Sequence, residues 1–212
     1  MSTCRNGEHR RAIPFVLVYN RAMPTTARRS TPPSQHVLEV ASDLFYREGI
    51  NSVGVDQIVR EAEVTRATLY RHYAGKEALV VAYLQREDDM LRDVFAKGEA
   101  QAVSPEHMLE SALEGIADDA TRHHTRGCPF INATAEFPDA DSPVRKVVAA
   151  HRTWFRDSLA RYLSDAGRKN ADATADALVI LRDGVLVGSY LDDSARVRRA
   201  FLSTSRPLAG LA

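Results

Sequence analysis

Cysteine and long apolar runs are both scarce in this 212-residue sequence. Its two cysteines, Cys4 and Cys128, cannot build the disulfide framework of a small secreted domain, and they fit a reducing compartment. No apolar run approaches the roughly 20 residues that a membrane-spanning helix requires. The apolar run at residues 13–19 contains Pro14 and lacks a small-residue cleavage site, so we expect no signal peptide. These absences favour a cytoplasmic protein without membrane contact.

The sequence also lacks the short motifs that carry common enzyme chemistry. It contains no phosphate-binding loop, no Ser/Cys–His–Asp motif and no paired carboxylates. We therefore predict that the protein is not an enzyme and that it uses no cofactor and no metal. Two alternatives for Cys128 stay open: a redox or metal sensor, or a catalytic thiol that acts with His123, His124 or His151. The spacing of the first two histidines and Cys128 fits no zinc-binding pattern.

Net charge is zero, and the charges are unevenly distributed. Residues 1–30 hold 6 basic and 1 acidic residue, residues 31–76 hold 5 and 6, and the remainder holds 17 and 21. Residues 64–76 contain three basic residues and no acid. A local excess of positive charge of this kind indicates a polyanionic partner for that segment rather than for the whole chain.

Residues 1–30 show no helical period and carry scattered proline, glycine and arginine. This composition predicts a disordered basic arm. Part of the arm is never made if translation starts at Met23, which would leave a short tail before the first helix. Sequencing the N-terminus of the native protein distinguishes the two starts.

Apolar residues at helical spacing run through the rest of the chain. Strand-like runs such as residues 177–181 lie inside longer helical patterns. We therefore predict an all-α fold of about nine helices. Residues 31–78 are expected to form a three-helix unit, residues 79–206 a helical domain and residues 207–212 a short tail.

The second and third helices of the first unit are predicted from their boundaries. The second covers residues 55–62, and Glu63 lies in the turn that follows. Thr65 can cap the third helix with its hydroxyl. Thr31 is expected to cap the first helix in the same way. A long helix then covers residues 76–98.

The helical domain begins two of its helices with serine followed by proline, at residues 104–105 and 142–143. Three acids lie four residues apart on one side of the first of these helices: Glu110, Glu114 and Asp118. We interpret them as a solvated face. The last long helix is expected at residues 172–191, and a shorter one follows to about residue 205.

The third helix has the composition of a helix that reads DNA. Such a helix needs hydrogen-bond donors on its exposed face and apolar residues behind it. Leu69 and Tyr73, four residues apart, are expected to face inward. Arg66 and Arg71 can donate to guanine edges or phosphates. Lys76 stands at the start of the next helix, where the helix dipole also attracts a phosphate.

The run DQIVREAEVTRATLYRHYAGKEAL, residues 56–79, resembles the N-terminal domain of TetR-family transcriptional repressors. The resemblance rests on the threonine start, the T-L-Y-x-H-aromatic core and the K-E-x-L that follows, and it extends to the helix at residues 41–49. It implies a helix-turn-helix repressor of the TetR/AcrR type. By this resemblance the following residues face DNA: Thr65, Arg66, Ala67, Thr68, Tyr70, Arg71, His72 and Lys76.

Two positions depart from the family pattern. Glu63 stands where the family usually has glycine, so a positive φ in the turn would be strained by up to about 1 kcal/mol. Gly54 and Val55 stand where a threonine often caps the second helix, so one phosphate contact is expected to be missing.

The resemblance further implies a homodimer that leaves a palindromic operator when a small-molecule effector binds. We expect the effector among these residues of the helical domain: Met108, Phe130, Asn132, Phe137, His151, Trp154 and Phe155. Bare glycines let two helices approach closely, which suggests a dimer seam on the last long helix at Leu181, Gly184, Val185 and Gly188. A DNA-binding activator or chromosome-organising protein without an effector stays open as the alternative.

Overall fold

In the computed structural model, which describes residues 32–211, every regular element is a helix and no strand occurs. The nine α-helices of this range are α1 (Pro33–Glu48), α2 (Val55–Glu61), α3 (Arg66–His72), α4 (Lys76–Gln101), α5 (Pro105–Asp118), α6 (Pro129–Glu136), α7 (Pro143–Asp165), α8 (Ala171–Leu191) and α9 (Ser194–Leu208). The predicted all-α fold is confirmed. The predicted basic arm, the second start at Met23 and the cap at Thr31 lie outside the described residues. Within those residues, no helix has the length and apolar character needed to cross a bilayer.

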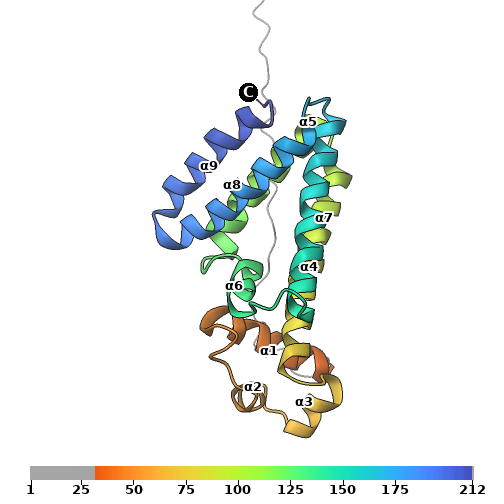
Figure 1. Ribbon diagram of the computed structural model, residues 1–212, viewed down its shortest axis with the longest axis vertical. Helices are drawn as coiled ribbons and strands as arrows, with labels where there is room; N and C mark the ends of the chain where they lie inside the picture. The colour runs from red at the N-terminus through yellow and green to blue at the C-terminus, as the bar shows by residue number, and fades with distance from the viewer. Residues whose placement is uncertain (1–31, 212) are drawn as a thin grey trace, which may run out of the picture.

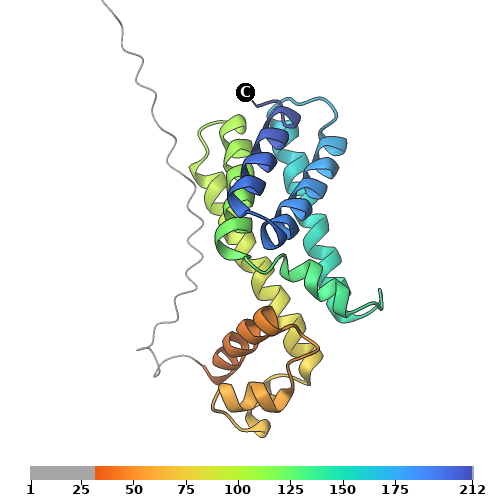
Figure 2. The same ribbon diagram turned by 90° about the vertical axis from the view of Figure 1, so that its left-hand side faces the viewer.

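The helices form an elongated molecule with a small head at one end (Figure 1). We use "head" for α1–α3 and "body" for α4–α9. Helix α4 runs from the head into the body and joins the two (Figures 1 and 2). Helix α8 packs between α7 and α9. The end of α6 contacts the loop that follows α1, where body and head meet. A change in the body can therefore reach the head along α4 or through α6.

The core of the head is apolar. Each of its three helices contributes a side chain with at most 1% of its surface exposed: Leu44, Ile58 and Leu69. The Tyr73 hydroxyl donates a hydrogen bond to the Ser34 carbonyl oxygen at 2.9 Å, which fastens the end of α3 to the start of α1. The predicted inward orientation of Leu69 and Tyr73 is confirmed, with Tyr73 only partly buried.

The turn between α2 and α3 has the conformation that the sequence predicted. Glu63 has φ of 53°, the left-handed region that glycine adopts without strain. Gly54 precedes α2 and supplies no side-chain cap, as expected. The head therefore forms despite two local costs, because the apolar contacts among its helices outweigh them.

Two helices of the body end later than their sequence pattern indicated. Helix α4 continues to Gln101 rather than ending near residue 98, and its last turn is fastened because Arg161 of α7 donates to Glu99 at 2.6 Å. Helix α9 continues to Leu208 rather than residue 205. Its last turn carries Arg206, which pairs with acids of α5. In both helices, the additional last turn is held by a residue that lies far away in the sequence.

The three acids of α5 form ion pairs with α9, so the prediction of a solvated face is wrong. Asp118 is only 6% exposed, and Arg198 Nη2 lies 3.1 Å from its carboxylate. Arg206 Nε donates to Glu110 at 2.8 Å. Glu114 contacts both arginines. Arg198 and Arg206 are spaced along α9 so that each lies opposite acids of α5, and the acids therefore face α9.

Helix α5 changes its winding before it ends. At Asp119 the chain continues as a π-helical turn, Asp119–His123, in which the wider winding inserts an extra residue. Asp119 is 7% exposed, so the turn directs a carboxylate into the body. Single π-helical turns of this kind occur often at functional sites.

Candidate DNA interface and effector cavity

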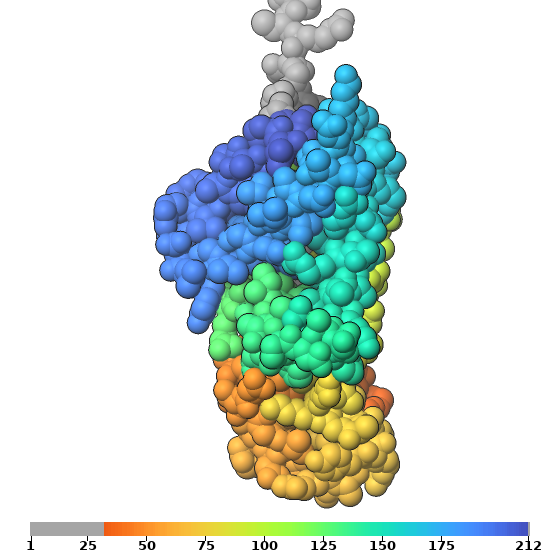
Figure 3. Space-filling view, in the orientation of Figure 1, coloured from red at the N-terminus to blue at the C-terminus, as the bar shows by residue number. Residues whose placement is uncertain are grey.

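Helix α3 lies at the end of the head that points away from the body (Figure 3). The residues predicted to face DNA that are exposed there are Thr65, Arg66, Ala67, Tyr70, Arg71 and His72. Thr68 and Lys76 are partly buried. Tyr70 leaves 48% of its surface exposed although it is aromatic, while Leu69 beside it is fully buried. One face of α3 is thus fixed to the head and the other is open.

The first turn of α3 is capped as predicted. Thr65 Oγ1 accepts a hydrogen bond from the Thr68 backbone N–H at 3.1 Å. The two threonine hydroxyls are 2.9 Å apart. Both hydroxyls are therefore held in place at the N-terminal turn of α3.

An ion pair that the sequence did not indicate links α2 and α3. Arg66 of α3 contacts the Asp56 carboxylate at the start of α2. The two side chains are 62% and 67% exposed, and exposed pairs of this kind contribute little stability. Arg66 can therefore exchange Asp56 for a phosphate or a base edge at small cost.

Lys76 begins α4 beside an acid of the body. Partial burial lowers the pKa of Lys76, and the negative charge of Glu136 opposes that shift. Glu136 also accepts hydrogen bonds from the Ile50 N–H at 2.9 Å and the Asn51 N–H at 2.5 Å. The last residue of α6 thus holds the loop between α1 and α2, a contact that spacing alone did not indicate.

Tyr46 of α1 makes a second connection between head and body. Its hydroxyl donates to the Gly127 carbonyl oxygen at 3.1 Å and accepts from the Arg126 N–H at 2.8 Å. The ring of Tyr46 lies edge-on to His124, with centroids 5.7 Å apart. The segment between the π-helical turn and α6 is therefore in direct contact with the head.

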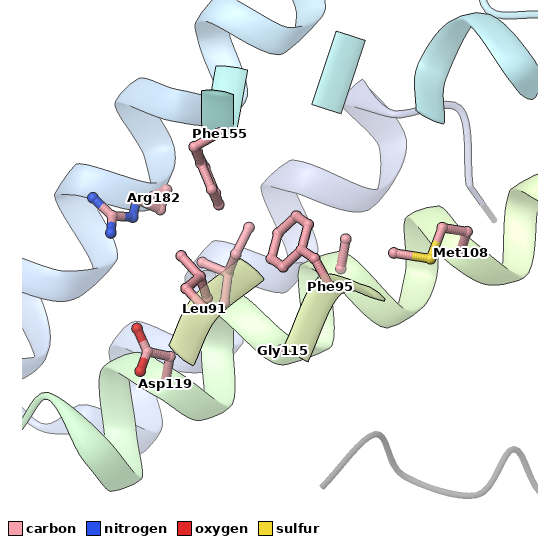
Figure 4. Close-up of a pocket in the computed structure, with 9 residues that line it drawn as sticks. Leu91, Phe95, Met108, Gly115, Asp119, Phe155 and Arg182 are labelled. Carbon is pink, nitrogen blue, oxygen red and sulfur yellow. The ribbon is translucent and has the colours of Figure 1, made fainter. Parts of the chain in front are cut away.

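A small cavity lies in the body between α4, α5, α7 and α8 (Figure 4). Leu91, Phe95, Ile116 and Phe155 form much of its apolar wall. The cavity measures about 20 Å³, which is room for one water molecule. Met108 and Phe155, two residues of the predicted effector set, line it.

Asp119 and Arg182 lie at one end of the cavity with their charged groups directed away from it, and Met108 lies at the other end (Figure 4). Asp119 accepts a hydrogen bond from His124 Nδ1 at 2.7 Å. Burial alone would raise the pKa of Asp119, but His124 and, to a smaller degree, Arg182 hold it below its usual range.

His124 is the positive partner of that carboxylate. Burial opposes its positive charge, yet Asp119 and Glu87 raise the pKa of His124 to about 10. His124 Nε2 lies 3.4 Å from the Glu87 carboxylate. His124 is therefore a cation at neutral pH, and it lies between Asp119 and Tyr46.

Sequence reasoning missed both Asp119 and Arg182. It ranked apolar side chains as effector contacts, whereas the fold brings a buried ion from the π-helical turn beside one from α8. One signal was present: Arg182 and Asp183 interrupt the apolar run of residues 177–188. A charge inside an otherwise buried helix is costly unless it has a partner or a function.

Three more of the predicted effector residues form an aromatic cluster beside the cavity. The Phe130 and His151 rings stack with centroids 3.6 Å apart, and Trp154 packs on Phe95 at 5.3 Å. Burial and the charge of Arg182 lower the pKa of His151 to about 4. Neutral His151 thus donates through Nδ1 to an Asp88 carboxylate oxygen at 2.7 Å. Within residues 32–211 its Nε2 has no hydrogen-bond partner.

The last two predicted effector residues lie elsewhere. Asn132 lines a surface groove of about 260 Å³ with Glu136 and Tyr190, and it donates to the Arg126 carbonyl oxygen at 3.1 Å. Phe137 is half-buried at the end of α6. The seven residues therefore do not form one site.

Cys128 is fully buried, and Arg182 Nη1 donates a hydrogen bond to its sulfur at 3.4 Å. The partner of the thiol is therefore an arginine rather than one of the histidines considered for catalysis. In the described part of the chain, no group of three or more histidine, cysteine or acidic side chains could hold a metal ion.

Comparison with known proteins identifies the family. The family model "Bacterial regulatory proteins, tetR family" matches residues 37–83, and "Tetracyclin repressor-like, C-terminal domain" matches residues 106–202. The crystal structure of SCO4454, a TetR-family transcriptional regulator from Streptomyces coelicolor, is 37% identical with a TM-score of 0.81, over 84% of this chain and 94% of that one. This chain belongs to the TetR family. Members of the TetR family are transcriptional regulators, which confirms the prediction that the protein is not an enzyme.

Curated TetR-type relatives match over a shorter part of the chain. An uncharacterized HTH-type transcriptional regulator of Mycobacterium tuberculosis is 36% identical over 85 residues, 40% of this chain and 42% of the relative. The HTH-type transcriptional repressor DhaR of Mycobacterium sp. strain GP1 is 28% identical over 116 residues, 54% of this chain and 57% of DhaR. The chain thus spans about half the length of these relatives. The TetR-family model matches residues 37–83 and so covers the head except the first turn of α1.

TetR-family regulators are typically dimeric, so the residues predicted for a dimer seam matter. They lie on different sides of α8. Val185 is 3% exposed, Leu181 is half-buried, and a Cβ on Gly188 would lie 3.2 Å from Val197 of α9. Around Gly184, apart from its chain neighbours and the nearby backbone of α8, no atom of the described residues lies within 4 Å of such a Cβ. Of the four, Gly184 is the one that faces open space in a single chain.

Proposed function

We propose that this TetR-family chain is a repressor that binds an operator through α3 and leaves it when a small effector binds the body. The observation that carries the DNA-binding part is the two-sided construction of α3. Leu69 fixes the helix from behind, and its other face presents arginines, hydroxyls and an exposed tyrosine. This is the arrangement that a helix needs to enter the major groove.

The exposed residues divide into two roles. Arg66 and Arg71 contact base edges, because a guanidinium can donate two hydrogen bonds to guanine. Tyr70 and Lys76 contact the backbone, where they fix the register of the helix without reading sequence. Thr65, Thr68, Ala67 and His72 complete the surface.

The protein acts as a homodimer on a near-palindromic operator. One exposed stripe of α8 supports this proposal: Ile180 is 71% exposed, Val187 is 38% exposed and Leu191 is 71% exposed, with Gly184 between them. These positions recur at helical spacing on one side, and a second copy would cover them. Two-fold symmetry of the protein then requires a two-fold operator.

Effector binding reaches the head through contacts that the body already makes. Asp119 lines the cavity and holds His124, which packs on Tyr46 of α1. Glu136 holds the loop between α1 and α2. An effector that binds one arrangement of these contacts better than another shifts the two heads between arrangements.

A gel shift with the DNA upstream of the protein's own gene tests the proposal. Tyr70→Ala and Lys76→Ala should weaken binding to all sequences, whereas Arg66→Ala and Arg71→Ala should also relax base preference. Equal losses on every operator variant for all four would contradict the assigned roles. Failure to bind that DNA, and to enrich any sequence from a random pool, would contradict DNA reading itself.

A DNA-binding protein without an effector is the second candidate. The small size of the cavity favours it, since room for one water molecule does not accommodate an effector unless side chains move. Such a protein would hold its operator at every metabolite concentration. A screen of small molecules against the protein–operator complex distinguishes the two, because only the first candidate is released.

A further inference from the structure

The two arginines of α3 have different surroundings. Arg66 begins the helix, and its Nη2 contacts the Asp56 carboxylate at the start of α2. Arg71 lies in the last turn, and in the described part of the chain no acid pairs with it. Five residues of an α-helix span about 7.5 Å, which is about two base-pair steps. The two side chains can therefore reach different base pairs, and only one of them has an acid as its partner.

The pair between Asp56 and Arg66 contributes little to the stability of the head. The two side chains are 67% and 62% exposed, and exposed ion pairs are weak. Ile58 and Leu69, both fully buried, already fix α2 and α3 in the head. An acid beside the DNA-reading helix also repels phosphates, so Asp56 by itself weakens binding to DNA of any sequence. The main effect of the pair is therefore on what Arg66 can bind.

The pair cancels the charge of Arg66 and leaves most of its hydrogen-bond donors free to bind DNA. A guanidinium has five N–H donors, and the contact with Asp56 involves Nη2. Guanine O6 and N7 are neutral acceptors that the remaining donors can reach. A phosphate instead attracts an arginine largely through charge. If a phosphate replaced Asp56, the carboxylate would be left unpaired beside the DNA backbone. The pair therefore favours guanine over phosphate as the partner of Arg66.

We propose that Asp56 is a specificity-determining residue, which positions Arg66 for one guanine of each half-site and withholds it from phosphates. Asp56 touches no base and acts through Arg66, so it is a positioning residue. Arg71 has no such partner and serves as an internal comparison. This inference deepens the proposed function and rests on it for the contact of α3 with DNA.

The test compares Asp56→Asn with Glu61→Gln in the full chain. Both substitutions remove one negative charge from α2 and nearly keep the shape of the side chain. Glu61 is the matched control because it lies 3.9 Å from Arg60 of its own helix. Dissociation constants are measured at one salt concentration for an operator selected with the parent chain, for its single-base variants and for unrelated DNA. The ratio of the constants for unrelated DNA and operator gives the specificity.

Asp56→Asn should lower the specificity about threefold, the size expected when one exposed ion pair is lost, because Arg66 becomes free to bind phosphates of unrelated DNA. Glu61→Gln should change both constants alike and leave their ratio unchanged. Base preference in Asp56→Asn should relax only at the position that Arg66→Ala also relaxes, and not at the position that depends on Arg71. Asp56→Glu, which keeps the carboxylate, should retain most of the specificity.

The double variant Asp56→Asn/Arg66→Ala separates the pair from the direct repulsion between Asp56 and DNA. Its specificity should equal that of Arg66→Ala alone, because Asp56 then has no arginine to position. An unchanged specificity in Asp56→Asn overturns the inference. An equal loss in Glu61→Gln, or a further loss in the double variant, overturns it as well, since the effect would then not pass through Arg66.

The pair itself is tested without DNA, by nuclear magnetic resonance of the Arg66 guanidinium, whose signal is identified by its absence in Arg66→Ala. Rotation about the Nε–Cζ bond should be slower in the parent chain than in Asp56→Asn. Equal rotation in the two proteins contradicts the pair. A parent chain that binds no DNA contradicts the proposed function instead, so the two failures are distinguishable.

Discussion

The head and the body are stabilised by different chemistry. In the described residues of the head, the buried side chains are apolar except for two hydroxyls. The Ser42 hydroxyl donates to the Leu38 carbonyl oxygen at 2.7 Å, and the Tyr46 hydroxyl bonds to the body. The body buries charged groups among its apolar residues, as Glu87, Asp119 and Arg182 illustrate. Apolar contacts need only the right shape, whereas buried ions also need a specific partner.

This difference matches the tasks proposed for the two regions. The head has to keep one arrangement, and an apolar core keeps it without a dependence on pH or salt. The body has to respond to a ligand, and buried polar groups can exchange a protein partner for a ligand. Substitutions, pH and salt should therefore affect the two regions in different ways.

Among substitutions in the head, the largest effect is expected for Leu69→Ala. Leu69 is fully buried, and its truncation should lower the free energy of unfolding by about 3 kcal/mol. Tyr70→Ala is the matched control: it removes an exposed side chain and should change stability by less than about 0.5 kcal/mol while still weakening operator binding. Denaturant unfolding followed by circular dichroism measures both. Similar destabilisation by the two variants would show that Tyr70 has a structural role.

In the body, a dependence of stability on pH is expected from His124. Its pKa is about 10 in the folded chain and about 6.5 when unfolded, so the folded state binds the extra proton. The stability it contributes is fully present below about pH 6.5 and is lost as pH rises through about 10, by up to about 1.4 kcal/mol per pH unit.

Denaturant unfolding at several pH values between 7 and 10 measures that slope. His124→Gln should flatten it, because the titrating group is gone. His72→Gln, at an exposed position of α3, should retain the slope of the parent chain. A parent chain whose stability does not change across this range would show that Asp119 and Glu87 do not hold a charged His124.

A smaller effect is expected where α9 meets α5. Arg206→Ala removes contacts with Glu110 and Glu114 and should cost about 1 kcal/mol, since all three side chains are about one-third exposed. Arg199→Ala, an exposed arginine of the same helix, is the control and should be nearly neutral. The difference between the two melting temperatures should shrink in high salt, because exposed ion pairs are screened. A difference that survives high salt would indicate lost packing rather than lost charge.

The smallest effect is expected at Glu63, in the turn of the head. Glu63→Gly removes the strain of a positive φ and should raise stability by up to about 1 kcal/mol, less the entropy that glycine gains in the unfolded chain. Glu61→Gly, at the last residue of α2, should instead lower stability by up to about 1 kcal/mol. Differential scanning calorimetry compares the two. A lower melting temperature for both variants would mean that Glu63 makes stabilising contacts that exceed the strain.

The head was largely predictable because its determinants lie within a few residues of one another. The Thr65 cap, the buried Leu69 and the positive φ at Glu63 all follow from local spacing and turn chemistry. The pair between Arg66 and Asp56 did not follow, since it depends on how α2 and α3 cross. Helical periodicity predicts which side of a helix is polar, but it does not predict which other helix packs against that side.

The same limit explains what was missed in the body. The acids of α5 looked solvated because Arg198 and Arg206, which pair with them, lie 80 or more residues later in the chain. Met108 and Phe155 were predicted as effector contacts from their apolar character and do line the cavity, while Asn132 lies in a different groove. The roles of Asp119 and Arg182 were not predictable from spacing, because the two residues come to the same end of the cavity only in the folded chain.

Selection from a random pool of double-stranded DNA, with the full chain and with Arg71→Ala in parallel, tests the central claim most directly. The account predicts that the parent chain enriches an inverted repeat whose two half-sites are about one helical turn, or a multiple of it, apart. Arg71→Ala should enrich the same spacing with relaxed preference at one position of each half-site. No enriched sequence, or identical preferences for both proteins, would contradict the claim that α3 reads DNA.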